Sequence, residues 1–181
     1  MTATDVPALD PDRSSESDRD RDRDRDPGLG RVEAIHVTDA GSRPMRAVER
    51  VRAMAGIGLE GDRYARGTGH YSDKPKVDRQ ITLIEAEEIE ALEAGSGIRL
   101  APGESRRNVT TRGIRLNELV GRRFRIGGVE CEGTRLCEPC QYLTDLLGKP
   151  VLGPLVHRAG LRARILTDGE IALGDEVIAL D

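Results

Sequence analysis

The segment 122–133, RRFRIGGVECEG, constrains the fold of this chain most strongly. Phe124 and Ile126 alternate with charged residues, Gly127 and Gly128 follow, and Val129 begins a second alternation. Alternating apolar residues on both sides of a Gly-Gly pair predict a β-hairpin. Residues 161–180 carry a related pattern, in which an Asp-Gly turn and a Gly-Asp turn separate three predicted strands. The chain therefore favours short antiparallel strands.

The other expected elements are also short. We expect strands at 31–39 and 106–113, and a buried strand that runs into a helix over 79–95, with Gly95 as the helix stop. We expect short helices at 114–121, after Pro139, and at 154–160, whereas 45–54 is either a strand pair or a helix and 56–76 is a Gly-rich loop. Together these elements predict a mainly β fold, a closed or semi-closed β-barrel with a few short peripheral helices.

Charge separates the chain into two parts. Residues 1–30 carry nine acidic and five basic side chains with few apolar ones, so we expect a disordered charged tail followed by one domain at 31–181. Subtracting the tail from the totals of 32 acidic and 28 basic residues leaves 23 of each, and this balance argues against a nucleic-acid partner. The sequence shows no signal peptide and no apolar span, so we expect a cytoplasmic protein without a membrane partner.

The segment CEPC, 137–140, holds two of the three cysteines. A thioredoxin-like redox pair is one interpretation, although such a pair normally follows a βαβ pattern and here follows a hairpin. A zinc site that uses Cys131, Cys137 and Cys140 with a histidine is a second, although no second pair of ligands with metal-site spacing exists. Three ordinary packed thiols are the plainest alternative.

A further interpretation is one exposed thiolate at Cys140. Placed one residue after Pro139 in the first turn of a helix, it would lie near backbone N–H groups and the positive helix end, which favour the anion. A stabilised thiolate suits either a soft metal or a persulfide transfer. Cys137 would then lie just outside the helix, and Cys131 would be a small apolar residue inside the hairpin.

The ordered series GLEGDRYARG, RQITLIEAEEIEAL, RRNVTTRGIRLNELVG, the hairpin, CEPCQYL and RAGLRARILTDGEIALGDEV resembles the MOSC domain family, named for the C-terminal part of molybdenum-cofactor sulfurases. The resemblance covers residues 31–180 and is to single-domain bacterial members. It implies a MOSC-type barrel, similar to the pyruvate kinase β-barrel, and one cysteine central to function. The family is also associated with pyridoxal phosphate binding.

The resemblance also implies roles for particular residues. Cys140 takes the position of the family's functional cysteine, which in amidoxime-reducing members is a molybdenum ligand of a bound pterin cofactor. Arg106 and Asn108, with Arg107 beside them, would hold the phosphate or pterin, and guanidinium groups suit phosphate oxygens. Arginines at a sheet edge are equally often solvated residues that prevent edge pairing.

The loop EGDRYARGTGHYSDK forms the other expected wall of the site. Arg63 is expected to contact the anionic cofactor, while Asp62 fixes the turn. His70 is a candidate proton donor, since the ordinary pKa of histidine lies near working pH, and it is equally an exposed loop histidine.

The resemblance implies a molybdenum-dependent oxidoreductase that reduces N-hydroxylated substrates. Because the sequence has no dinucleotide fingerprint and no iron–sulfur cysteine run, we expect the electrons to come from a separate reductase. The alternatives are a sulfur carrier or transferase with a Cys140 persulfide, and a non-catalytic module that binds the molybdenum cofactor.

Overall fold

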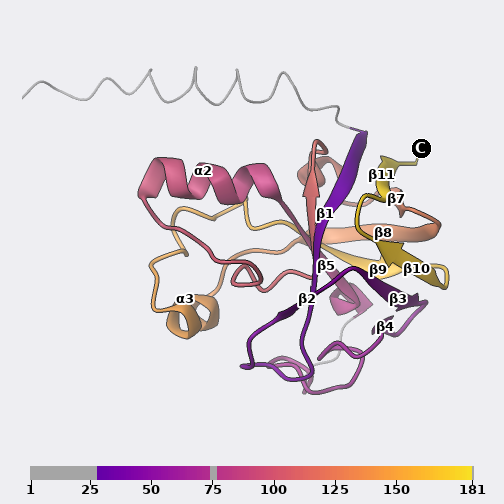
Figure 1. The fold of residues 1–181 in the computed structure, drawn as a ribbon, viewed down its shortest axis with the longest axis horizontal. Coiled ribbons are helices and arrows are strands. Elements are labelled where there is room, and N and C mark those ends of the chain that lie inside the picture. The colour runs from indigo at the N-terminus through magenta and orange to yellow at the C-terminus, as the bar shows by residue number, and fades with distance from the viewer. Residues whose placement is uncertain (1–27, 74–76, 181) are drawn as a thin grey trace, which may run out of the picture.

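The computed structural model describes residues 28–73 and 77–180 (Figure 1). Residues 1–27 of the expected tail lie outside the described residues. The described chain forms eleven strands: β1 (Leu29–Val37), β2 (Arg46–Val48), β3 (Arg50–Met54), β4 (Gly58–Leu59), β5 (Ile81–Glu85), β6 (Val109–Arg112), β7 (Arg123–Ile126), β8 (Val129–Leu136), β9 (Leu161–Ile165), β10 (Gly169–Ala172) and β11 (Glu176–Ala179). The helices are α2 (Ala86–Ser96) and α3 (Gln141–Leu147), with the 3₁₀ turns η1 (Val77–Arg79) and η2 (Leu116–Leu119).

Seven strands close into a barrel, which confirms the predicted fold class. The order around the barrel is β1, β6, β5, β9, β8, β7 and β11, and β11 pairs again with β1 through Leu29 opposite Ile178. The pair β5–β6 is parallel and the other barrel pairs are antiparallel. Strand β2 adds to the end of β1, and β10, β3 and β4 form a separate three-stranded sheet.

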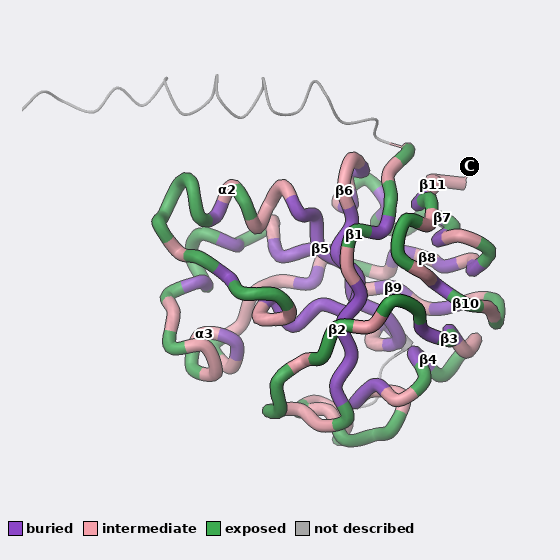
Figure 2. The backbone as a smooth tube through the Cα atoms, viewed as in Figure 1, coloured by how far each residue is buried: buried purple, intermediate pink, exposed green. Residues whose placement is uncertain are grey.

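The barrel interior holds the main hydrophobic core. On the predicted hairpin, Phe124, Ile126, Val129 and Cys131 are all fully buried, while the residues between them are more exposed. This is the alternation expected of strands that bury one face. Figure 2 shows the buried positions following the barrel strands.

A smaller satellite core lies outside the barrel, where α2 and α3 pack (Figure 1). Its buried members are Leu92, Leu100, Leu143, Val151, Leu155 and Ala159. Because Leu143 belongs to α3, this satellite core fixes the helix that follows the CEPC segment.

Several local predictions were right and others were wrong. The strand–helix unit, the hairpin and the last three strands form as predicted, and 45–54 forms two strands that pair in different sheets rather than with each other. However, the predicted helix at 154–160 consists of turns, with His157 at a φ of 60°. Helix α2 passes through Gly95 and ends at Gly97, whose φ of 70° supplies the left-handed cap.

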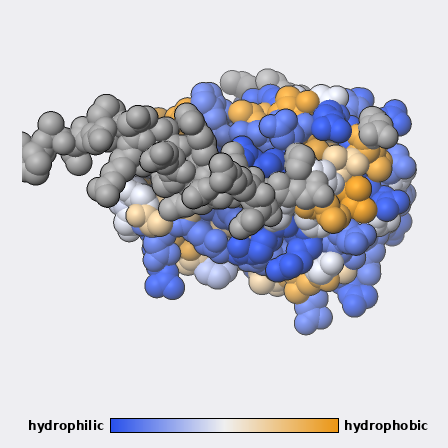
Figure 3. Space-filling view, turned by 90° about the horizontal axis from the view of Figure 1, so that it is seen from above, coloured by the Kyte–Doolittle hydropathy of each residue, from blue (hydrophilic) through white to orange (hydrophobic). Residues whose placement is uncertain are grey.

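The described surface is mainly polar. Figure 3 shows one face on which hydrophilic residues surround smaller apolar patches. Among the described residues, no helix has the length and apolar character needed to cross a membrane.

Candidate functional site

The three cysteines occupy different environments, and all three are free. Cys131 lies fully buried in the barrel, where burial raises the pKa of its thiol to about 12. Cys137 is 2 % exposed, and its amide N–H donates to the Gly160 carbonyl at 2.7 Å. Cys140 is partly exposed. Among the described residues, no three His, Cys, Asp or Glu side chains converge as metal ligands.

Cys140 lies at the N-cap of α3 rather than inside its first turn, which corrects the predicted position by one residue. Its φ of −142° and ψ of 162° are extended, and its carbonyl accepts the amide N–H groups of Leu143 and Thr144 at 3.0 and 3.2 Å. Pro139 therefore precedes the cap, and the seven-residue helix begins at Gln141. Leu143 anchors α3 in the satellite core, while Cys140 lines a cavity beside it.

The Cys140 cavity has a volume of about 50 Å³ and brings together most of the predicted site residues. Its lining combines Gly41, the loop after β4, β5, the segment before β6, the CEPC segment, α3 and β9. The charged and aromatic lining residues are Arg63, Arg106, Arg107, Arg162, Glu138, His70, Tyr64, Tyr71 and Tyr142. Four guanidinium groups against one carboxylate make the lining cationic. Asp62 and Asn108 lie behind it, fully buried.

Tyr71 is the residue whose side chain bonds to the cysteine. Its hydroxyl donates to Cys140 Sγ at 3.6 Å. Burial, followed by the hydrogen bond and the negative charge of Cys140, raises the pKa of Tyr71 to about 12. A phenol that keeps its proton is a hydrogen-bond donor to a thiolate throughout the physiological range.

His70 lies in the same cavity and contacts aromatic rings. Its ring stacks on Tyr142, with centroids 3.8 Å apart and planes 9° from parallel, and meets the edge of Tyr71 at 4.6 Å. Tyr142 in turn donates from its hydroxyl to the Gly41 carbonyl at 2.7 Å. The three rings form an aromatic wall next to the thiol.

Asn108 is a buried connector between strands and the Gly-rich loop. Its Nδ2 donates to the His36 carbonyl at 3.2 Å and to Asp62 Oδ1 at 3.1 Å. Its Oδ1 accepts from the Thr82 amide and hydroxyl at 3.2 and 3.0 Å. All four hydrogen-bonding positions of the amide thus have protein partners.

The neighbouring arginines bind backbone carbonyls. Arg106, at a φ of 63°, donates to the carbonyls of Gly41 and Arg43. Burial, and then the positive charge of Arg63, lowers the pKa of Arg106. Arg107 donates to the carbonyls of Ala159 and Cys137 at 2.8 and 2.7 Å, so it ties the CEPC segment to the start of β9.

Asp62 and Arg63 form the buried base of the loop. Asp62 accepts from the amides of Thr38 and Tyr64, both at 3.3 Å, so its carboxylate binds the backbone of the loop. Arg63 pairs with Asp62 at 3.3 Å and donates to the Arg106 carbonyl at 2.9 Å.

The sequence placed Tyr71 in the expected loop wall without a role of its own, and it did not place Tyr142 or Arg162 in the site. The position of Tyr71 next to His70 in a Gly-rich loop was the available signal. The signal for Tyr142 was its place two residues after the CEPC segment, whereas Arg162 looks like any outward residue of a strand.

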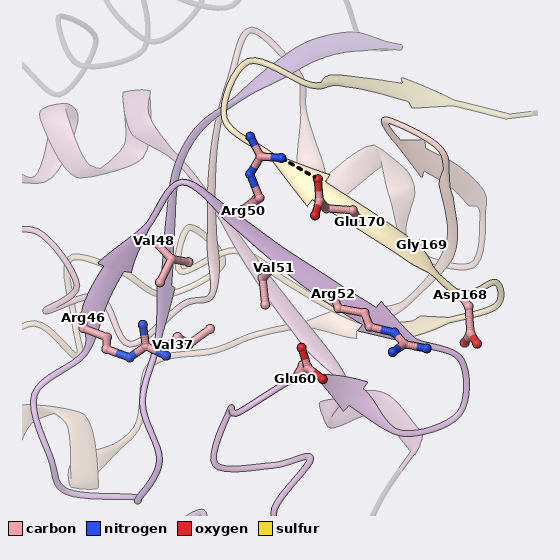
Figure 4. A pocket seen from close by; sticks show the side chains of 10 residues that line it. All are labelled: Val37, Arg46, Val48, Arg50, Val51, Arg52, Glu60, Asp168, Gly169 and Glu170. Carbon is pink, nitrogen blue, oxygen red and sulfur yellow. Dashed lines mark hydrogen bonds and ion pairs between the residues drawn. The ribbon is translucent and has the colours of Figure 1, made fainter.

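A larger cavity, of about 650 Å³, lies elsewhere and contains none of the predicted site residues (Figure 4). It runs along β3 and β10, and Arg50 and Glu170 on its rim form an ion pair at 3.2 Å. The predicted site residues therefore gather in a different cavity from this one.

Solved structures show the same fold. YuaD from Bacillus subtilis is 19 % identical with a TM-score of 0.69, over 82 % of this chain and 94 % of that protein. YiiM from Geobacillus stearothermophilus is 16 % identical with a TM-score of 0.65, over 84 % and 75 %. YiiM from Escherichia coli is 16 % identical with a TM-score of 0.61, over 83 % and 70 %.

The curated proteins include no match to this sequence. The family model of the MOSC domain matches residues 59–178, which include the Gly-rich loop, Arg106–Asn108, the CEPC segment and the last strands. These are the segments on which the sequence resemblance rests, and the match spans well over half of the chain. The chain belongs to the MOSC domain family.

Proposed function

We propose that this protein binds a molybdenum-pterin cofactor with Cys140 as the molybdenum ligand, and that it reduces N-hydroxylated substrates with electrons from a separate reductase. One observation carries the proposal: the partly exposed thiol lines a cavity with four arginines and a single glutamate. A soft sulfur donor suits molybdenum, and clustered guanidinium groups suit a phosphate.

The chemistry of the lining fits the cofactor, but the cavity limits how much of it enters. A volume of about 50 Å³ is far below the roughly 300–1,000 Å³ of pockets that enclose whole ligands. Only the part of the ligand that binds the thiol occupies this volume, and the remainder lies outside it or requires displacement of the Gly-rich loop.

The residues of the chain have separate tasks in this proposal. Cys140 holds the metal, Tyr71 donates its hydroxyl proton in a hydrogen bond to the sulfur, and the arginines offset the negative charge of a phosphate. When bound, the molybdenum centre supplies oxygen-atom acceptance and two-electron redox chemistry. The chain offers no flavin or iron–sulfur motif, so the reductase is a second protein.

Metal and pterin analysis tests the proposal. Protein produced in a host that makes the cofactor should carry molybdenum at about one atom per chain, with matching pterin fluorescence after release. The Cys140→Ser variant should lose N-hydroxyl reduction. If it also retains cofactor, the arginine contacts are sufficient for binding. Wild-type protein without molybdenum, or with NADH-driven reduction and no reductase, contradicts the proposal.

The small volume favours a second candidate, a sulfur carrier. A Cys140 thiolate that attacks the outer sulfur of a persulfide donor forms a Cys140 S–S bond, breaks the donor's S–S bond and releases the donor thiolate. One added sulfur atom fits a cavity of about 50 Å³. Cyanide-labile sulfur at about one per chain without molybdenum, absent in Cys140→Ser, would support this candidate over the first.

A further inference from the structure

Arg162 lies on the outer face of the barrel. Along β9, Leu161, Ala163 and Ile165 are buried in the interior, so the alternation turns Arg162 and Arg164 outward. Arg162 is opposite Thr82 on β5, and both line the Cys140 cavity. Its charge is close enough to Tyr71 to act on the pKa of that hydroxyl.

Arg162 differs from its neighbours because it has no acceptor. The other three cavity arginines donate to carbonyls or to Asp62, as described above. On the same outer face, Arg164 pairs with Glu132 at 2.6 Å and Arg135 pairs with Asp78. The buried Nε atoms of Arg162 and Arg164 both lack a partner, but Arg164 is held through its Nη2 by Glu132. Within residues 28–73 and 77–180, the Arg162 side chain makes no ion pair or hydrogen bond.

The carboxylate of Glu138, which also lines the cavity, does not accept a hydrogen bond from Arg162. Glu138 is the one carboxylate of the lining, and it accepts the amide and ring N–H groups of His157 at 2.8 and 2.7 Å. Burial alone would raise the pKa of Glu138, but these hydrogen bonds outweigh it and lower the pKa. Buried donors in native proteins normally have partners in the protein or in ordered water, and in this cationic lining an external anion is the partner that would also offset the charge of Arg162.

We propose that Arg162 forms an oxyanion-binding subsite next to Cys140, which takes a phosphate or carboxylate group of the molecule held at the thiol. Arg162 is the cavity arginine that can bind such a group without first giving up a hydrogen bond inside the protein. The identity of the natural ligand rests on the proposed function, whereas the anion site itself does not.

Alkylation of Cys140 tests the site without any cofactor. The Cys140 thiolate attacks the CH2 carbon of anionic iodoacetate or of neutral iodoacetamide and releases iodide in both cases, so the ratio of the two rates is insensitive to the thiol's own ionisation. Cys140→Ser gives the background from the two buried cysteines. In Arg162→Gln, the iodoacetate-to-iodoacetamide ratio should fall roughly fivefold, since a positive wall concentrates anions. Inorganic phosphate should slow iodoacetate in the wild type and have little effect in Arg162→Gln.

Arg164→Gln is the matched control, because it removes the same charge two residues away on the same strand face. It should leave the ratio unchanged. An equal fall in both variants would mean a general surface effect and would overturn the proposal, as would an unchanged ratio in Arg162→Gln or an absence of phosphate competition.

Two further measurements separate the sources of the anion. If Arg162→Gln protein from a cofactor-producing host loses pterin, Arg162 binds the phosphate of the cofactor. If pterin content stays and the KM rises for carboxylate-bearing substrates but not for neutral ones, Arg162 binds the substrate. If neither quantity changes, Arg162 has no natural ligand at this site and the proposal fails. A chain that never carries molybdenum but passes the alkylation test would instead fail the proposed function alone.

Discussion

At the scale of single residues, Tyr71 gives a direct titration signal. The chain has three tyrosines and no tryptophan, so ultraviolet absorbance follows tyrosine ionisation without interference. We expect one tyrosine to ionise with a midpoint of about 12 and to disappear from the titration in Tyr71→Phe. In Cys140→Ser the midpoint should fall, since the negative charge of the thiolate is replaced by a neutral hydroxyl. The stabilisation that the Tyr71 proton provides is fully present below pH 10 and is lost as pH rises through 12. A midpoint that does not move in Cys140→Ser would contradict the contact.

Asn108 supports a second prediction at this scale. Its side chain is 1 % exposed and has four protein partners, so Asn108→Ala leaves several buried groups unsatisfied. We expect a loss of about 3 kcal/mol in the free energy of unfolding, measured with urea. Asn117→Ala removes a single exposed hydrogen bond to the His157 carbonyl and should cost less than about 1 kcal/mol. Equal losses would mean that the buried network is not what makes Asn108 important.

The same residues show what the sequence could and could not predict. Arg106 and Arg107 of the segment RRN line the same cavity as Cys140, and their role there stays a prediction from the family resemblance. The sequence does not reveal that the guanidinium groups of Arg106 and Arg107 donate to backbone carbonyls. These carbonyls lie far apart along the chain, at Gly41, Arg43, Ala159 and Cys137. Arg162 and Arg164 are equivalent in the strand pattern, and only the position of Glu132 distinguishes the paired arginine from the unpaired one.

At the scale of elements, the hairpin of β7 and β8 contains two glycines, Gly128 and Gly133, whose surroundings differ. A Cβ at Gly133 would lie 2.1 Å from the Leu119 carbonyl oxygen, whereas a Cβ at Gly128 would meet nothing within 4 Å. The turn η2 therefore packs closely against β8, where the Gly133 amide donates to the Arg122 carbonyl at 3.0 Å and the Gly133 carbonyl accepts from the Gly121 amide at 2.8 Å. We therefore expect Gly133→Ala to lower the free energy of unfolding by about 3 kcal/mol and Gly128→Ala to change it little. Urea unfolding of both variants checks this, and a mild Gly133→Ala would mean that η2 shifts easily.

Prediction of elements succeeded where local pattern alone decides the structure. The hairpin is specified by alternating apolar residues and a Gly-Gly turn, and the folded protein contains both. The helix expected at 154–160 does not form, because its buried apolar residues reach the satellite core without a helical backbone. Leu155 enters the satellite core from a turn, and His157 adopts a left-handed conformation that ends any helical run. Tertiary packing thus overrides a short helical period.

At the scale of the whole molecule, the Cys140 thiol lies at the satellite core, outside the barrel. The barrel closes through β1 and β11, the two ends of the described chain, while Cys140 packs against the satellite core of α2 and α3. A satellite of six buried residues has less apolar contact than the barrel and should open more readily. The cavity around Cys140 can therefore change while the barrel stays folded.

Leu155→Ala and Ile126→Ala separate the two cores, since both delete three buried carbons, one from each core. Ile126→Ala should lower the global free energy of unfolding by about 2–5 kcal/mol, as large-to-small core changes do. Leu155→Ala should instead act mainly on the satellite, so amide hydrogen exchange in 141–147 should accelerate at least about tenfold, which corresponds to about 1.4 kcal/mol. The urea midpoint should then shift less than in Ile126→Ala. The contrary outcome is that the two variants lose the same free energy of unfolding, with hydrogen exchange in 141–147 accelerated to the same degree. That result would mean that the barrel and the satellite core unfold as one unit, and that Cys140 is held as rigidly as the barrel.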